Sequence, residues 1–208
     1  VQYIEEIDTA NVDEMHEIMA VGAGIGGGFT HTSKLRPMKY DEAMRGPKAK
    51  YWDLAVNEEH ERMKNHAVFK AVKISNVPKF AKILSSLWAM KQKANGTLRA
   101  RLNACGFKQR PGEHYEETGI LSPVVNKASI FIILILMIMG RMYAKLNNVK
   151  GAFLNGMFSN GEKLYMHVPQ GFEKFYPKNV VLLVLKTIYG LKQAAFEYWR
   201  ALLKALRA

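Results

Sequence analysis

The chain has 208 residues, 49% of them hydrophobic, and a formal net charge of +12; this length allows one domain or two small ones, and the composition argues against wholesale disorder. Its single cysteine, Cys105, excludes an internal disulfide and a cysteine-based zinc cage, and it indicates a reducing compartment. Residues 1–15 are polar and acidic and do not resemble a signal peptide, so we expect an intracellular protein of the cytoplasm or nucleus.

The positive charge is concentrated in one quarter of the chain. Residues 62–112 contain no Asp or Glu and hold twelve Lys and Arg residues, whereas the other 18 basic residues are matched by 18 acidic ones. Such an uneven field attracts polyanions, nucleic acid above all. The distribution therefore predicts a polyanionic partner, and a solvated basic surface without a ligand is the alternative.

Residues 1–46 predict a weakly structured lead-in, because a glycine cluster and Pro37 interrupt any regular element. The cluster, Gly22 to Gly27, satisfies the G-x-G-x-x-G spacing of dinucleotide-binding proteins. That motif requires a strand before it and a helix after it. Residues 13–20 are too charged for a buried strand, and residues 29–37 contain Thr, Ser and Pro, so we interpret the glycines as a linker.

The first predicted helix begins after Pro47 and ends near Asn65. Three apolar residues recur at helical spacing and predict its buried face: Trp52, Val56 and Met63. Three acidic residues are expected to face solvent: Glu58, Glu59 and Glu61.

Two strand-like runs, residues 83–93 and 97–105, flank Asn95-Gly96 and predict a β-hairpin. A two-residue turn would place Lys91 and Lys93 on the face opposite Arg99 and Arg101. A three-residue connection, residues 94–96 with a bulge at the glycine, would place all four cations on one face. We expect the second arrangement, because it gathers these charges.

The second half of the chain mixes strands and helices without regular alternation, which predicts an α+β fold. Residues 130–139, IFIILILMIM, are too few to cross a bilayer, which takes about 20 residues as a helix, so we expect a buried core segment, either helix or strand. Strands are predicted at residues 142–149, 164–168 and 180–185, and an amphipathic helix from Leu191 nearly to the end.

Five motifs follow one another along the chain: LRARLNACGFKQ (98–109), GEHYEET (112–118), NVKGAFLNG (148–156), LYMHVPQGF (164–172) and YGLKQA (189–194). In this order they resemble the motifs KARLVAKGFxQ, GxDYxETFAPV, DVKxAFLxG, xYMxxPxGF and YGLKQA of the copia-type retrotransposon reverse transcriptases, which are RNA-directed DNA polymerases. The resemblance covers roughly residues 47–208. It implies the fingers and the start of the palm, a partial reverse transcriptase domain with a basic β-hairpin and a C-terminal helix.

The resemblance also implies what is missing for catalysis. In this family the Asp that opens DVKxAF and two Asp residues of a later Tyr-x-Asp-Asp hairpin hold two Mg²⁺ ions, which require anionic oxygen ligands. Here Asn148 occupies the position of the first Asp, and the 208 residues contain no Asp-Asp pair. We therefore expect a truncated, inactive domain that retains no metal site or cofactor.

The same resemblance implies which residues bind nucleic acid. The basic hairpin would contact template and incoming triphosphate through Arg99 and Arg101, with Lys91 and Lys93 as further candidates. Two other positions complete the predicted site: Phe153 would lie under the sugar, and Gly190 would let the backbone approach the nascent base pair. The expected partners are an RNA template or an RNA–DNA hybrid, and no membrane. A non-enzymatic nucleic-acid-binding domain and a nucleotide-cofactor oxidoreductase using the glycine cluster remain alternatives.

Overall fold

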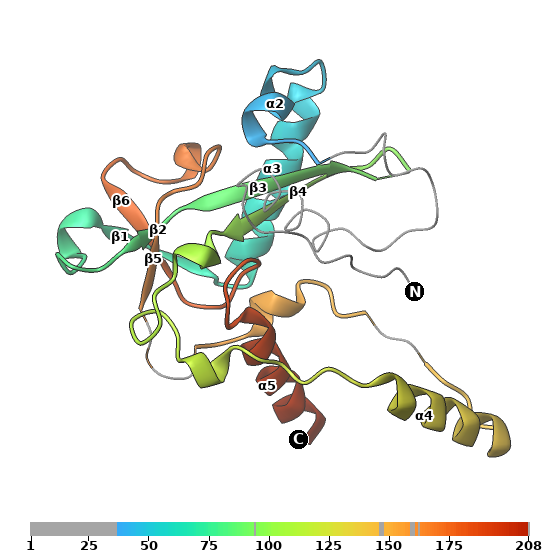
Figure 1. The fold of residues 1–208 in the computed structure, drawn as a ribbon. Coiled ribbons are helices and arrows are strands. Elements are labelled where there is room, and N and C mark those ends of the chain that lie inside the picture. The colour runs from blue at the N-terminus through green and yellow to red at the C-terminus, as the bar shows by residue number, and fades with distance from the viewer. Residues whose placement is uncertain (1–36, 94, 146–147, 159–160, 162, 208) are drawn as a thin grey trace.

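A computed structural model describes residues 37–207, apart from residues 94, 146–147, 159–160 and 162 (Figure 1). The glycine cluster Gly22 to Gly27 lies outside the described residues. The helices are α2 (Tyr40–Arg45), α3 (Ala49–Asn65), α4 (Lys127–Met139) and α5 (Ala194–Arg207). The strands are β1 (Phe69–Lys73), β2 (Ile83–Leu84), β3 (Ser86–Gln92), β4 (Leu98–Ala104), β5 (Leu164–Met166) and β6 (Val180–Val184). Short 3-10 turns are η2 (Ile74–Asn76), η3 (Gly106–Lys108), η4 (Glu117–Gly119), η5 (Ala152–Asn155) and η6 (Glu173–Phe175).

The strands form two sheets, which confirms the α+β class. One sheet has four strands in the order β1-β6-β5-β2, in which β2 and β5 run parallel and the other neighbours antiparallel. The other is the β3–β4 hairpin, the long green ribbon in Figure 1. β5 and β6 lie within two of the strands expected from the sequence. α2 precedes residue 47 and buries Ala43, so the regular structure begins inside the segment expected to be a lead-in.

The hairpin has the expected three-residue connection. Lys91 lies opposite Arg99, and the Lys93 N–H donates to the Thr97 carbonyl at 2.8 Å, which leaves residues 94–96 as the connection. Gly96 has a φ of +82°, a value that glycine adopts without a steric penalty. Because directly opposite residues share a face of a sheet, the pairing places four cations on one side: Lys91, Lys93, Arg99 and Arg101. We call this side the cationic face.

Helix α3 packs along β4 and carries much of the hydrophobic core. Trp52, Val56 and Met63 are buried, as expected, and they join Trp88 and Leu102 from the other side of the hairpin. The expectation that Glu59 faces solvent is wrong, because its side chain is only 1% exposed. Its position, seven residues after Trp52 and four before Met63, puts it on the same stripe of the helix as these core residues.

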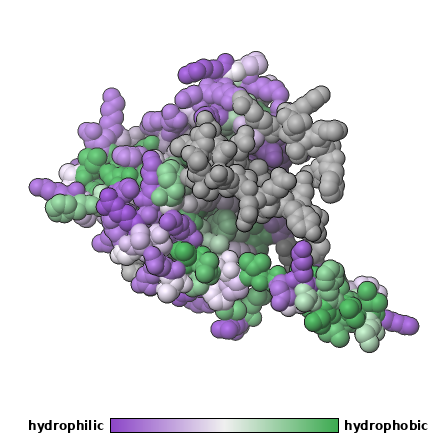
Figure 2. Space-filling view, viewed as in Figure 1, coloured by the Kyte–Doolittle hydropathy of each residue, from purple (hydrophilic) through white to green (hydrophobic). Residues whose placement is uncertain are grey.

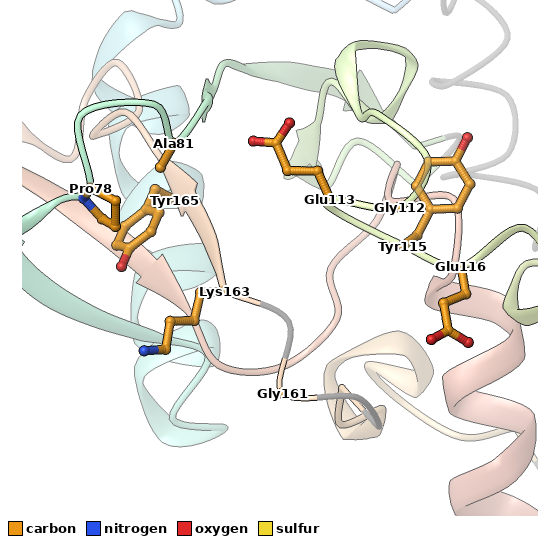
Figure 3. A pocket seen from close by; sticks show the side chains of 9 residues that line it. All are labelled: Pro78, Ala81, Gly112, Glu113, Tyr115, Glu116, Gly161, Lys163 and Tyr165. Atoms are coloured by element: carbon orange, nitrogen blue, oxygen red, sulfur yellow. The ribbon is translucent and has the colours of Figure 1, made fainter.

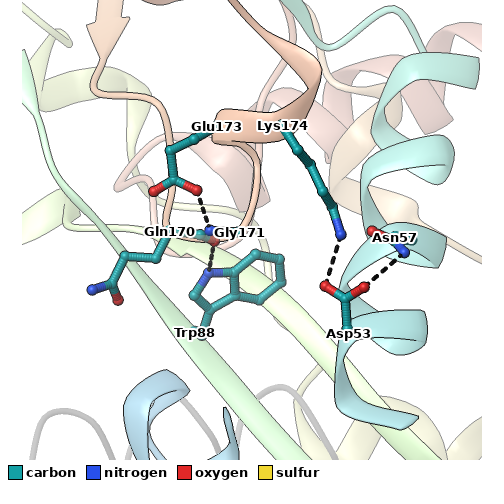
Figure 4. Close-up of polar contacts among 7 residues, drawn as sticks. All are labelled: Asp53, Asn57, Trp88, Gln170, Gly171, Glu173 and Lys174. Atoms are coloured by element: carbon teal, nitrogen blue, oxygen red, sulfur yellow. Dashed lines mark hydrogen bonds and ion pairs between the residues drawn. The ribbon is translucent and has the colours of Figure 1, made fainter. Parts of the chain in front are cut away.

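The loop after β5 ties α3 and β3 together (Figure 4). The Trp88 indole N–H donates to the Gln170 carbonyl at 2.9 Å, and the Lys174 ammonium pairs with Asp53 of α3 at 2.7 Å. The side chain of Glu173 accepts the Gly171 N–H at 2.6 Å and shapes the turn between them. The LYMHVPQGF motif at 164–172 therefore has a structural role, because it links β5 to β3 through Gln170, and Lys174 just after it adds the contact with α3.

Two expectations for the middle of the chain are wrong. Residues 130–139 form most of helix α4, but none of its residues is buried, and the helix projects from the rest of the molecule as an apolar surface (Figures 1 and 2). A helix that is apolar all round needs cover on every side, and the described residues provide none. Of the strand expected at 142–149, the described residues 142–145 and 148–149 form no strand, since no neighbouring strand pairs with them. In the described part of the chain, no helix has the length and apolarity needed to cross a membrane.

Candidate nucleic-acid interface

The cationic face ends on a pair of aromatic rings. The Arg101 guanidinium lies 4.9 Å from the centre of the Tyr189 ring, within the range of a cation–π contact. Tyr189 in turn meets Phe153 edge to face, with ring centres 5.2 Å apart. Three segments far apart in the sequence thus converge here: strand β4, turn η5 and the loop before α5. Together they place Arg101, Phe153 and Tyr189, the neighbour of the predicted Gly190, at one site.

None of the four cations of the cationic face has an ion pair with a described residue. By contrast, other basic residues such as Arg62, Arg110 and Lys174 are paired with carboxylates. Lys93 is exposed, while Lys91, Arg99 and Arg101 are half-buried. Gathered like charges without counter-ions repel one another, so a polyanion that binds there relieves this repulsion.

Arg101 is the most constrained of the four. Burial lowers the pKa of its guanidinium, but an arginine remains charged at any physiological pH. Its Nε–H is buried without a hydrogen-bond acceptor among the described residues. Leaving a buried donor unpaired costs about 1–3 kcal/mol.

The loop that contains Tyr189 and Gly190 is held against the end of β4. The Ala104 N–H donates to the Tyr189 carbonyl at 2.7 Å. A Cβ atom at Gly106 would lie 1.9 Å from the Gly190 carbonyl oxygen, so only glycine permits this approach. The contact explains why a glycine follows β4 and a second glycine, with a φ of +86°, follows Tyr189.

Phe153 is held from two sides. It lies in η5, which follows Gly151, and its carbonyl accepts a hydrogen bond from the Thr187 hydroxyl. On the other side its ring contacts Tyr198 of α5 edge to face, with centres 6.3 Å apart. The ring is therefore fixed next to Tyr189 and remains half-buried rather than part of the fully buried core.

Other motif residues hold the fold together around this site. The Gln109 side chain donates to Gln193 and accepts the Lys192 N–H, each at 2.9 Å, and Gln193 donates to the His114 carbonyl at 2.9 Å. The Lys192 ammonium donates to the Tyr115 hydroxyl at 2.9 Å. Three of the five motifs thus meet in one hydrogen-bond network, which accounts for Gln109, Lys192 and Gln193 without a ligand.

Asn148 lies in a segment without regular structure and is exposed, five residues before Phe153. Mg²⁺ binds hard anionic oxygens, and this residue offers a single neutral amide oxygen. The described residues also include no group of three or more His, Cys, Asp or Glu side chains placed to hold a metal. The residues present therefore do not fit the Mg²⁺ ions that the sequence motifs imply.

A separate feature is a pocket of about 400 Å³ (Figure 3). Its lining comes from the loop before β2, the turn after η3 and β5, and it includes the carboxylates of Glu113 and Glu116 and the ammonium of Lys163. Two acids and one base give it the wrong charge for a polyanion. None of the residues predicted to bind nucleic acid lines it.

The sequence analysis missed two residues of this region, Tyr189 and Glu59. Tyr189 is the first residue of the YGLKQA motif (189–194), in which only Gly190 was expected to contribute to the site. The signal for Glu59 was its place on the Trp52, Val56, Met63 stripe, where an acidic side chain cannot remain without a partner.

Fold and site together define an α+β protein in which a cationic hairpin face, without ion pairs to the described residues, adjoins a small aromatic cluster. Residues 68–208 match the pattern of the family described as "Reverse transcriptase (RNA-dependent DNA polymerase)". The chain belongs to this reverse transcriptase family.

Curated relatives point to mobile elements. The chain is 33% identical over 168 residues to the retrovirus-related Pol polyprotein from transposon TNT 1-94 of Nicotiana tabacum, which covers 78% of this chain and 12% of the relative. It is 37% identical over 122 residues to the corresponding polyprotein from transposon RE1 of Arabidopsis thaliana, which covers 56% of this chain and 8% of the relative. The chain thus spans only a small fraction of these polyproteins. No solved structure shows a significant match to it.

Proposed function

We propose that these 208 residues are the fingers and the start of the palm of a retrotransposon reverse transcriptase, that they bind a nucleic-acid template strand on the cationic face, and that they do not polymerise. The observation that carries the binding proposal is the set of four cations on one face of the hairpin, none of them paired with a described residue. The match to the reverse transcriptase family supports the choice of nucleic acid over other polyanions.

The geometry suits a backbone that runs along the hairpin. Opposite residues of an antiparallel pair are about 5 Å apart, and alternate residues of a strand about 7 Å. The four cations therefore occupy three successive positions along the hairpin, with Lys91 and Arg99 side by side at the middle one. The aromatic pair Tyr189 and Phe153 at the end of this row offers a surface on which a sugar or base can pack. The preferred ligand is a template strand within an RNA–DNA hybrid.

The lack of polymerisation follows from charge. Two-metal catalysis needs several carboxylates at one point, and Asn148 supplies none. Replacing Asn148→Asp restores one carboxylate and leaves the rest of the set absent from these residues. We therefore expect no nucleotide incorporation by the chain or by this variant on a primed RNA template. Incorporation by the Asn148→Asp variant alone would refute the assignment of this position.

Fluorescence anisotropy with a labelled RNA–DNA hybrid tests the binding site. The wild-type chain is expected to bind with submicromolar to micromolar affinity. The double variant Lys91→Gln, Arg99→Gln removes two charges from the cationic face and should weaken binding about tenfold or more, because each lost phosphate contact reduces the electrostatic attraction.

A matched control removes two charges from the other sheet. Lys70 and Lys73 are exposed residues of β1, so Lys70→Gln, Lys73→Gln changes net charge by the same amount at a distant place. This control should bind nearly as tightly as the wild-type chain. Equal weakening in both double variants would show that net charge alone, and not the hairpin, governs binding.

A further inference from the structure

Glu59 is a buried acidic residue that the proposed binding site does not use. Its side chain is 1% exposed. One carboxylate oxygen accepts the backbone N–H of Leu102 at 3.4 Å, and the other accepts from the Arg62 guanidinium at 2.5 Å. A carboxylate in this position is costly to bury unless its partners satisfy it, so these two contacts explain how the fold tolerates it.

The Leu102 N–H belongs to the peptide that directly follows Arg101. β4 pairs with β3 along one edge, and α3 lies along its other edge, where Glu59 covers this N–H. The next N–H on the same edge, that of Ala104, donates to the Tyr189 carbonyl. The strand around Arg101 is therefore held at two consecutive points, once by Glu59 and once by the loop that carries the Tyr189 ring.

We propose that Glu59 is a positioning residue for the cationic face: it fixes the Arg101–Leu102 peptide and thereby keeps the Arg101 guanidinium over Tyr189, where it meets the nucleic acid. This inference rests on the proposed function. Under this proposal, Glu59 has two effects of opposite sign on the affinity for nucleic acid. The negative charge of Glu59 repels a bound phosphate backbone, whereas its hydrogen bond to Leu102 places a cation toward that backbone.

The substitution Glu59→Asp distinguishes these effects, because it keeps the charge and shortens the side chain, so that the oxygen no longer reaches Leu102. Glu58→Asp is the matched control, since Glu58 is the preceding residue of α3 and is exposed. We expect Glu59→Asp to weaken binding of the RNA–DNA hybrid about fivefold, the equivalent of one net hydrogen bond, and Glu58→Asp to leave it unchanged.

A double-mutant cycle shows whether Glu59 acts through Arg101. Glu59→Asp should weaken binding in the wild-type background and have no further effect in an Arg101→Gln background. A general loss of structure would weaken binding equally in both backgrounds, and that result would overturn the inference. If Glu59→Asp does not fold, Glu59→Ala, which removes the acceptor for the Leu102 N–H, takes its place, and a smaller loss of affinity in the Arg101→Gln background is then the criterion.

Amide hydrogen exchange in the wild-type chain gives a second, independent measurement. The Leu102 amide should be protected, and Glu59→Asp should reduce its protection more than Glu58→Asp does. A Leu102 amide that exchanges as fast as an unstructured one would refute the contact. Failure of the wild-type chain to bind the hybrid would instead refute the proposed function, so the two failures remain distinguishable.

Discussion

At the residue scale, Arg101 combines three unusual features of its surroundings. Its guanidinium lies over an aromatic ring, its Nε–H has no acceptor in the described part of the chain, and the adjoining peptide is held by a buried carboxylate. The unpaired donor and the buried carboxylate cost stability, whereas the contact with the ring is favourable. Their combination at one residue is consistent with the binding role proposed for Arg101.

Two buried histidines predict how stability depends on pH. Burial lowers the pKa of His60 and of His114 below the ordinary value of about 6.5. Below that pH the unfolded chain binds more protons than the folded chain, so the stabilisation is complete above about pH 6.5 and decreases on acidification. Urea unfolding at a series of pH values should show this decrease.

Substitution of each histidine isolates its contribution to the loss of stability on acidification. His60 stacks on Phe175 with ring centres 3.9 Å apart, so His60→Phe retains a stacking ring without a titrating group. His60→Phe and His114→Gln should each reduce the loss of stability between neutral pH and about pH 5.5. Glu59, whose pKa burial raises, contributes with the opposite sign and is unchanged in both variants. An unaltered pH profile in both would contradict the assignment.

At the scale of elements, the contact between Gly106 and Gly190 joins η3 to the loop before α5. A methyl group at Gly106 cannot coexist with the Gly190 carbonyl at its present position, so Gly106→Ala must separate the two loops. We expect this variant to lose about 1–3 kcal/mol of unfolding free energy, as overpacking does, and to bind nucleic acid more weakly.

Gly46→Ala is the control for that substitution. Gly46 has an ordinary φ of −79°, and a Cβ there would meet its nearest atom at 3.6 Å. Its unfolding free energy should change by less than about 1 kcal/mol. Equal stability of Gly106→Ala and Gly46→Ala in urea titrations would show that the two loops are not in close contact.

The exposed apolar surface of helix α4 leads us to expect that the purified chain self-associates in solution. Its exposed apolar residues form the green projection in Figure 2, and such a surface promotes association. The pair Leu134→Glu, Ile138→Lys leaves net charge unchanged and adds a favourable i,i+4 pair. It should reduce light scattering by the purified chain without lowering its unfolding free energy. A loss of stability of about 2–5 kcal/mol would show instead that these residues are packed.

The hairpin and α4 show what the sequence can and cannot determine. The hairpin and its register were predictable because local turn chemistry and alternation act within a few residues, as at Asn95 and Gly96. The exposure of α4 was not, because the apolar run at 130–139 specifies a need for cover and not its source. The prediction of a strand at 142–149 was wrong for a related reason. A strand must pair with a neighbouring strand, and the spacing of residues along the chain does not identify that neighbour.

The candidate site was predictable in part. The motifs indicated the segments that carry Arg101, Phe153 and Gly190, and the structure brings these segments together. The contribution of Tyr189 depends on a loop fold, and that of Glu59 on packing between α3 and β4. Neither interaction has a signature in the spacing of the residues concerned.

At the scale of the whole molecule, positive charge is unevenly distributed, and the four cations of the hairpin face have no ion pair with a described residue. The excess lies in residues 62–112, and the fold brings four of those cations to a single face next to an aromatic pair. The remaining cations of that stretch include Arg62 and Arg110, which are paired with carboxylates. Binding is therefore expected to depend on a few defined charges.

The dependence of RNA–DNA hybrid affinity on salt concentration tests this account most directly. The logarithm of the wild-type binding constant should fall linearly with the logarithm of salt concentration, and Lys91→Gln, Arg99→Gln should make the slope shallower by about 2, close to one unit for each lost phosphate contact. The Lys70→Gln, Lys73→Gln control should keep the wild-type slope. A wild-type affinity that does not change with salt, or a slope unaltered by loss of the two hairpin cations, would contradict the account.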